Sequence, residues 1–332
     1  MAVSLSSLGS FFYRQFFVTP PHPAEDFTGK TIIVTGANVG LGFEAVKHFT
    51  RLNASKVVIA VRSLDKGEAA KKEIEFSTKR TGIVEVWQLD LLSYESVKQF
   101  AERASSLERI DALIENAGLA TQTHRLAASG NEVTIDTNVV STFLLALLLL
   151  PKLKQTAQRF NTQPHLVIVS SEVHFWTAFP ERLTPLNQKI FDTLNNKETA
   201  RMDDRYNVSK LLEVLICREI CKEHPQPYPV VINFLNPGFC HSSLTREMTG
   251  VTGILVTLFK YAVARTTEQG SRTLVHAAAA GPETHGRYLS DARIAEPSPL
   301  VASKEGEEAQ RRVWDELRAK LEEIQPGISN NL

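Results

Sequence analysis

The sequence predicts an α/β protein built on a doubly wound parallel sheet. Residues 31–34 and 56–61 form apolar runs rich in β-branched side chains, which is typical of strands covered on both faces. Between these runs Leu41, Ala45 and Phe49 recur at helical spacing, so an amphipathic helix is expected there. Because strands alternate with helices in this way, βαβ units and a parallel sheet follow.

The same alternation continues along the 332 residues and gives about seven strands in one domain. We expect one domain over residues 29–292, a substrate lid at about 239–264, an N-terminal extension over 1–28 and a C-terminal extension over 293–332 with one helix. The strands are expected at residues 31–34, 56–61, 82–89, 110–115, 166–171, 230–235 and 287–289. The later helices are expected at residues 64–77, 131–150, 267–280 and 307–324.

Charge and cysteine content limit the partners. Lys plus Arg equals Asp plus Glu at 37 each, so no net positive field favours nucleic acid, and a small-molecule substrate is expected. The three cysteines fit neither a disulfide framework nor a paired zinc motif, and no metal site is predicted. Cys217 and Cys221 are four residues apart and are expected on one apolar helix face. A reducing, cytoplasmic location follows.

Two apolar stretches bear on membrane association. Residues 8–18 are interrupted by Arg14 and Gln15 and are too short to span a bilayer, so this segment either packs on the domain or associates weakly with a membrane surface. Residues 139–150 precede Pro151 and suit a buried helix. No transmembrane segment is therefore expected.

A glycine turn follows the first strand. Gly36, Gly40 and Gly42, with Asn38 and Leu41 between them, would bring free backbone N–H groups and a helix N-terminus to one point, where a pyrophosphate can bind. Gly36 can take a positive φ, and a Cβ at Gly40 or Gly42 would stand between the backbone and a phosphate. A tight turn in some other α/β protein remains the alternative.

The end of the second strand indicates which dinucleotide fits. Arg62 stands there, with Lys66 one helical turn later, and Ser63 can cap the intervening helix start. A 2′-phosphate would meet positive charge at this point, so NADP(H) is favoured over NAD. Alternatively, Arg62 and Lys66 are solvated charges around a helix start.

Further motifs follow the later strands in order, and together they resemble those of the short-chain dehydrogenase/reductase family, in particular its retinol-dehydrogenase-like branch with many fungal biosynthetic members. The resemblance covers about residues 28 to 290 and implies a Rossmann-type fold. It rests on the glycine turn and on Asp90 with Leu91, Asn116-Ala117-Gly118, Asn138, Ser171, Tyr206-x-x-x-Lys210, and Pro237-Gly238 followed by Ser242.

The resemblance assigns roles to these residues. It implies that Asp90 binds the adenine, that the Asn116 motif supports the sheet beneath the nicotinamide ribose, and that Pro237 and Gly238 lie beside the nicotinamide carboxamide. Ser242 keeps the hydroxyl of the family's usual Thr, whereas Glu115 stands where the family usually has a second Asn. The resemblance also implies a homodimer, in which the apolar helix at 131–150 packs on its copy.

The chemistry of carbonyl reduction explains the other motif residues. Tyr206 would donate the proton to oxygen, and a phenol that titrates near ~10 needs roughly 4 kcal/mol of help to exchange protons at neutrality. Lys210, one helical turn away, supplies a cation, and Ser171 polarises the substrate oxygen. By resemblance, Asn138 holds a water that links Lys210 to solvent. Tyr94-x-x-x-Lys98 matches the same pattern, but no serine strand precedes it, and it is expected to be a surface decoy.

The substrate is only partly indicated. The 34 residues between Ser171 and Tyr206 carry Phe175 and Trp176, which could line a pocket for a hydrophobic or aromatic carbonyl compound or simply cover the crevice. His174 is expected at the surface or the pocket edge. A secondary-metabolite step, a retinol- or steroid-type alcohol dehydrogenase and a non-catalytic NADP-sensing protein stay open, while the glycine spacing disfavours a nucleotide-sugar epimerase.

Overall fold

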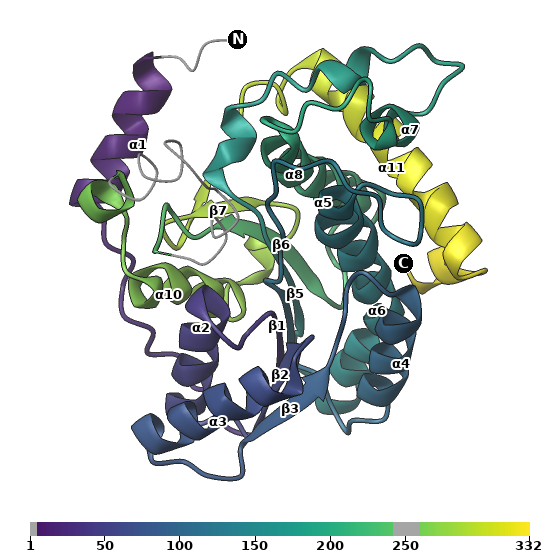
Figure 1. The fold of residues 1–332 in the computed structure, drawn as a ribbon. Helices are drawn as coiled ribbons and strands as arrows, with labels where there is room; N and C mark the ends of the chain where they lie inside the picture. The colour runs from purple at the N-terminus through teal and green to yellow at the C-terminus, as the bar shows by residue number, and fades with distance from the viewer. Residues whose placement is uncertain (1–4, 242–258) are drawn as a thin grey trace.

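The centre of the molecule is an eight-stranded sheet in the order β3-β2-β1-β4-β5-β6-β7-β8 (Figure 1). The computed structural model describes residues 5–241 and 259–332. Strands β1 to β7 are parallel, and only β8 runs antiparallel to its neighbour. The strands are β1 Thr31–Thr35, β2 Lys56–Val61, β3 Val84–Gln88, β4 Ala112–Glu115, β5 His165–Val169, β6 Val231–Asn236, β7 Tyr288–Ser290 and β8 Arg293–Ala295. The predicted doubly wound parallel class is confirmed.

Helices cover both faces of the sheet (Figure 1). Apolar residues of α2, α3 and α10 pack on one face, and those of α4, α6, α8 and α11 belong to the core on the other. The described helices are α1 Leu5–Phe17, α2 Gly40–Arg51, α3 Leu64–Thr78, α4 Tyr94–Ser105, α5 Val133–Ile135, α6 Thr142–Phe160, α7 Ile190–Asn195, α8 Arg205–Glu223, α10 Thr267–Ala277 and α11 Lys304–Ile324.

Burial on both faces explains the composition of the first strand. Ile33 belongs to the core under α4, α6 and α8, whereas Ile32 and Val34 belong to the core under α2, α3 and α10. Successive side chains of a strand point to opposite faces, so a strand between two helical layers must be apolar at every position. The interpretation of residues 31–34 as a doubly covered strand is confirmed.

Strand β8 was not expected. It follows β7 after a two-residue turn in which Asp291 and Ala292 both take positive φ, at 53° and 59°. Such turns usually contain Gly or Asn, so this pair gives no turn signal in the sequence. Arg293 and Ile294 are exposed, and the short strand therefore lacks the apolar pattern of the others.

The apolar helix around residue 140 is longer than expected. A π-helical segment, η1 (Asp136–Ser141), leads into α6, which continues through Pro151 to Phe160. Pro151 has no N–H to give to the carbonyl four residues earlier, that of Leu147. The side chain of Asn331 donates to that oxygen instead, at 3.0 Å. The carbonyl that the proline leaves without a helix donor is thus hydrogen-bonded by a segment near residue 331.

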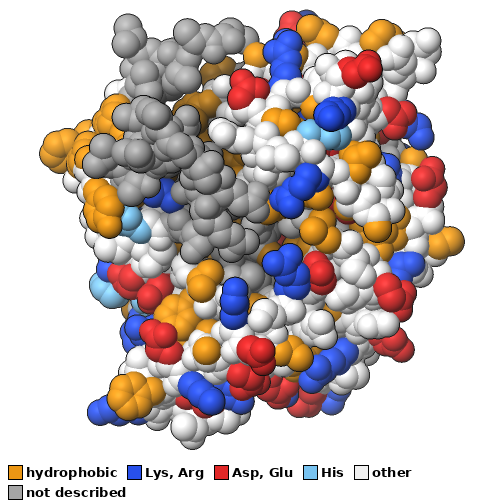
Figure 2. Space-filling view, in the orientation of Figure 1, with side chains coloured by type: hydrophobic (Ala, Val, Ile, Leu, Met, Phe, Trp, Pro, Cys, Tyr) orange, Lys and Arg blue, Asp and Glu red, His pale blue; other side chains and the backbone are white. Residues whose placement is uncertain are grey.

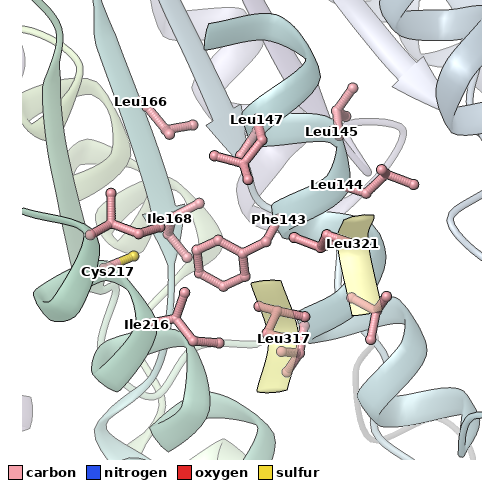
Figure 3. Close-up of a cluster of buried hydrophobic side chains, with 14 of the residues drawn as sticks. Phe143, Leu144, Leu145, Leu147, Leu166, Ile168, Ile216, Cys217, Leu317 and Leu321 are labelled. Atoms are coloured by element: carbon pink, nitrogen blue, oxygen red, sulfur yellow. The ribbon is translucent and has the colours of Figure 1, made fainter. Parts of the chain in front are cut away.

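The chain itself covers the apolar surface of α6. In Figure 3 the ring of Phe143 lies among Ile168 of β5, Ile216 of α8 and Leu317 of α11. Among the described residues, Val133–Phe160 is the one helical stretch long and apolar enough to cross a membrane, and 94% of its most apolar window is buried in the protein. The expectation of a buried helix is confirmed, and no second subunit is needed to cover it.

Candidate active site

The carboxyl ends of the central strands surround a cavity of about 650 Å³. Most of the residues predicted from the sequence lie in its wall. They are Gly36, Asn38, Gly40, Leu41, Arg62, Lys66, Asp90, Leu91, Asn116, Ala117, Gly118, Ser171, Tyr206, Lys210, Pro237 and Gly238. Gly42 and Asn138 lie behind this wall, and Ser242, with most of the predicted lid, lies outside the described residues.

The glycine turn leaves room for an anionic group. Gly36 has φ +66°, and a Cβ there would lie 2.9 Å from the Cα of Ala117. Gly40 opens α2 with φ +66° and open space around it, and the N-cap residue Val39 offers no side-chain acceptor to the first-turn N–H groups. Those groups are thus available to a phosphate. At Gly42 a Cβ would lie 2.6 Å from Nδ2 of Asn116, so this glycine makes room for packing of the helix on the sheet.

Two cations stand at the end of β2. Arg62 and Lys66 are exposed at the cavity, and neither forms an ion pair with any residue between 5–241 or 259–332. The Ser63 hydroxyl caps α3 by accepting from the backbone N–H of Lys66 at 3.5 Å, which confirms the expected helix start. Both charges are therefore free to meet a phosphate in the cavity.

The end of β4 is tied to the end of β1. The backbone N–H of Asn116 donates to Oγ1 of Thr35 at 3.0 Å, and its side-chain amide donates to the carbonyl of Thr35 at 2.8 Å. The backbone N–H of Ala117 also donates to that hydroxyl, at 2.9 Å. This motif holds together the two strands between which the order of the sheet reverses, where ligands bind in such folds.

Tyr206 and Lys210 occupy successive turns of α8. The Lys210 ammonium lies 5.8 Å from the centre of the Tyr206 ring and donates to the carbonyl of Val169 at 2.8 Å. Burial raises the pKa of Tyr206, whereas the charge of Lys210 and a hydrogen bond with Ser171 oppose that rise. The structure thus brings the three predicted side chains together at the cavity.

Glu213 is a site residue that the sequence analysis missed. Its Oε1 lies 2.8 Å from Nζ of Lys210, and its side chain is 2% exposed. Burial raises the pKa of this carboxyl to about 7, against the opposing effect of Lys210. Its negative charge also acts to raise the pKa of Tyr206. A glutamate within the apolar run 211–217 was the available signal, because a charge on a buried helix requires a partner.

A second carboxyl lies behind the first. Glu115 is 3% exposed, and burial raises its pKa to about 8, with the nearby charge of Glu213 adding to the rise. Its Oε2 accepts from Oγ1 of Thr35 at 3.3 Å. Oε1 of Glu115 and Oε2 of Glu213 have no hydrogen-bond partner in the described part of the chain. Lys210 is therefore paired with Glu213, and Glu213 in turn feels the charge of Glu115.

Sequence comparison finds a relative that is 50% identical over 97% of this chain and 99% of its own length. It is the short chain dehydrogenase/reductase dmxR8 of Cryptosporiopsis sp.. The chain belongs to the short-chain dehydrogenase/reductase family. The short-chain dehydrogenase anuD of Penicillium roqueforti is 43% identical over 98% of this chain and 86% of its own, and a family model described as short chain dehydrogenase matches residues 30–176.

Solved structures show the same fold. An alcohol dehydrogenase from the archaeon Thermococcus sibiricus, complexed with 5-hydroxy-NADP, superposes with a TM-score of 0.56. It is 17% identical and covers 79% of this chain and 95% of its own. The predicted membership of the family and its Rossmann-type fold are thus confirmed, and this dehydrogenase/reductase is an oxidoreductase.

In this dehydrogenase/reductase, Asn138 lies in the π-helical segment η1 and is fully buried. Its amide donates to the carbonyl of Leu119 and to Oγ of Ser209, both at 2.9 Å, and its Oδ1 accepts from the N–H of Leu119 at 2.7 Å. Asn138 thus links the segment after β4 to α8 by hydrogen bonds. Its part in a water relay to Lys210 stays a prediction.

The expected position of His174 was wrong, and Tyr94 lies outside the cavity as expected but is less exposed than a surface residue. His174 is completely buried and lies neither at the surface nor at the pocket edge. Its Nδ1 lies 2.6 Å from the carbonyl of Ser171, its Nε2 accepts from the N–H of Ser298, and burial lowers its pKa to about 4. Tyr94 lies outside the cavity, but it is half-buried, and its hydroxyl donates to Asp136 at 2.5 Å. Each side chain is held by hydrogen bonds within the fold, and neither lines the cavity.

Proposed function

We propose that the chain is an NADP(H)-dependent oxidoreductase that transfers a hydride between nicotinamide and the carbonyl or alcohol group of a small hydrophobic substrate. The observation that carries this proposal is the position of Tyr206, Lys210 and Ser171 in the same cavity wall as the glycine turn. The hydride of a bound nicotinamide and the proton of Tyr206 could then reach the same carbonyl group.

The cavity wall suits the proposed coenzyme. The first turn of α2 would hold the pyrophosphate, and Arg62 with Lys66 would hold a 2′-phosphate. Asp90 would bind the adenine, and Pro237 with Gly238 would lie along the nicotinamide. A structural relative complexed with an NADP analogue supports the phosphate-bearing form of the coenzyme.

Each protein side chain has one task in the proposed reduction. The reduced nicotinamide supplies the hydride to the carbonyl carbon. Ser171 donates a hydrogen bond to the carbonyl oxygen, and Tyr206 gives that oxygen its proton, so that an alcohol forms. The phenolate left on Tyr206 is stabilised by Lys210, and a proton from solvent restores the phenol. The reverse sequence oxidises an alcohol.

The surface charge and the relatives suggest the kind of partner and the location of the protein. The side chains of Lys and Arg alternate with those of Asp and Glu on the face seen in Figure 2, which suits a small-molecule substrate better than nucleic acid. A biosynthetic step is proposed from the resemblance to a branch with many fungal biosynthetic members, and the relatives from Cryptosporiopsis and Penicillium agree with that branch. A cytoplasmic location is proposed with it. A homodimer stays a prediction from the family resemblance, since α6 is already covered by α11 and its neighbours.

An activity screen tests the proposed function. The purified full chain is incubated with NADPH and a panel of aldehydes and ketones, or with NADP+ and alcohols, and the absorbance of NADPH is followed. Turnover that is faster with NADPH than with NADH is expected. Tight NADPH binding without turnover of any compound would instead favour a non-catalytic NADP-binding protein.

A further inference from the structure

The N-terminal helix α1 (Leu5–Phe17) reaches the cavity of the proposed active site. Phe11 lies in the cavity wall and is 3% exposed, whereas Tyr13 on the same helix is 61% exposed. In Figure 1 the purple α1 stands beside the green residues that lead into α10. One face of this helix therefore contributes to the cavity, and the other faces outward.

Phe11 joins an aromatic cluster built from distant parts of the chain. Its ring centre lies 5.8 Å from that of Trp176, with the rings inclined by 70°, and 6.4 Å from that of Phe239. The ring of Phe259 lies 5.4 Å from that of Phe239. All four rings line the cavity. The Phe11–Trp176 pair is edge-to-face and the other two pairs are tilted, and offset or edge-to-face contacts between aromatic rings are favourable.

The cluster lies at the end of the cavity where the reaction would occur. Phe239 directly follows the Pro237-Gly238 turn, and Trp176 comes five residues after Ser171. The proposed phosphate and adenine contacts, at Arg62 and Asp90, come instead from the ends of β2 and β3. The four rings are thus placed to meet the substrate rather than the adenosine half of the coenzyme.

Gln15 fastens α1 to the loop that carries Phe239. Its side-chain amide donates to the carbonyls of Phe239 and Val263, at 2.9 and 3.0 Å, and its Oε1 accepts from the N–H of Phe239 at 3.1 Å. Gln15 is buried, so these bonds are made away from water. They fix the distance between Phe11 and Phe239.

Arg14 fastens the same helix to two further loops. Its guanidinium lies 2.7 Å from Asp291, in the turn after β7, and 3.8 Å from Glu172, the residue after Ser171. Arg265 binds the other oxygen of Asp291 at 2.6 Å and also donates to the carbonyls of Arg14 and Val18. Arg265 and Asp291 are buried and Arg14 is partly exposed, and their mutual pairing offsets the cost of removing these charges from water. The pairing therefore holds α1 in one position.

We propose that α1 forms a wall of the substrate site and that Phe11, with Trp176 and Phe239, selects carbonyl compounds that carry an aromatic ring. The inference deepens the proposed function and rests on it for the reaction. Binding of an aromatic ring, however, can be measured without turnover.

The test compares two substitutions on the same helix. Phe11→Ala removes a ring from the cavity, whereas Tyr13→Ala removes an outward-facing ring and serves as the matched control. The dissociation constant of 2-tetralone, a ketone fused to a benzene ring, is measured by calorimetry on the full chain saturated with NADP+. Phe11→Ala should weaken this binding about 5- to 10-fold, and Tyr13→Ala should leave it within about 2-fold.

A second comparison separates ring recognition from general damage. Cyclohexanone has the same ketone ring without the benzene ring, and its KM should be unchanged by Phe11→Ala, while the KM for 2-tetralone rises. NADPH affinity reports whether each variant is folded. If Phe11→Ala loses NADPH affinity, Phe11→Leu replaces it, and the same selective weakening of 2-tetralone binding is expected.

The outcomes separate this inference from the proposed function. Selective weakening of 2-tetralone binding supports the aromatic wall even if no ketone is reduced, in which case only the proposed reaction fails. Absence of 2-tetralone binding to the parent chain, equal effects of the two substitutions, or equal changes for both ketones would overturn the aromatic wall.

Discussion

Lys210 and Glu213 form a buried ion pair, with 2.8 Å between Nζ and Oε1. Lys210 is expected to lower the pKa of Tyr206, and its positive charge is partly compensated by this carboxylate one turn later on α8. Because Glu115 lies behind this pair, the proton-transfer side chains belong to a buried network of four titratable groups. Burial, the charge of Lys210 and the charge of Glu213 together, rather than Lys210 alone, act on the pKa of the Tyr206 phenol.

Replacing Glu213 by Gln should shift the pH dependence of reduction. Reduction needs a protonated Tyr206, so activity falls as pH rises through the pKa of that phenol. The ionised Glu213 raises this pKa, and the Gln substitution removes the negative charge. We expect the alkaline loss of kcat/KM to move roughly one pH unit lower. Glu219→Gln, on the same helix but bonded to Gln310, is the control and should leave the profile in place.

Tyr206→Phe should abolish turnover and leave NADPH binding within a few-fold of the parent. Loss of a general acid costs roughly 10²- to 10⁴-fold in rate, whereas most of the proposed coenzyme contacts lie outside α8. The rate is measured with a substrate found in the activity screen, and the affinity by fluorescence titration. Tyr94 belongs to the second Tyr-x-x-x-Lys sequence of the chain and lies outside the cavity, so the Tyr94→Phe variant should keep the activity of the parent. A Tyr206 variant with most of its rate intact would rule out the proposed mechanism.

Arg62→Asp should reverse the coenzyme preference. The substitution places a negative charge where a 2′-phosphate is expected, so NADPH affinity should fall at least about 10-fold while NADH affinity holds or improves. Dissociation constants for both coenzymes give the ratio directly. Lys72→Asp makes the same charge change on the exposed part of α3, away from the cavity, and should not alter that ratio. An unchanged ratio in the Arg62 variant would show that this residue does not bind the coenzyme.

Glu115→Gln should flatten the dependence of stability on pH. The pKa of this carboxyl is raised from 4.5 to about 8 in the folded chain, so the folded state keeps a proton that the unfolded state releases between these values. The free energy of unfolding must then fall as pH rises across that window. Glu213 acts in the same direction only up to about pH 7. Between pH 7 and 8 the free energy of unfolding of the parent should fall by about 1 kcal/mol more than that of the variant.

Denaturant unfolding at several pH values measures this effect. Glu296→Gln, at an 85% exposed side chain, is the control and should follow the parent. Equal slopes for the parent and the Glu115 variant between pH 7 and 8 would show that Glu115 is ionised at neutrality in the folded chain.

Much of the site could be predicted because its residues follow the strands in order. Polar residues at the carboxyl ends of successive parallel strands converge on one edge of the sheet, whatever the loops do. Arg62, Asp90 and Ser171 were located in this way, and all three line the cavity, as do Gly36 of the glycine turn and Tyr206 at the start of α8. Glu213 was not predicted as a site residue because it lies inside a helix. The sequence alone does not show that its carboxylate points to Lys210.

What the sequence determined by itself was local and repetitive. The spacing of apolar residues dictates strands and helices, and β-branched runs such as residues 56–61 require a sheet buried on both faces. What only the tertiary structure decided depends on groups far apart in the chain. Asn331 supplies the donor that α6 lacks at Pro151, and α1 brings Phe11 to rings more than 160 residues away. Such contacts follow from how packed elements meet in space, and no periodicity along the chain encodes them.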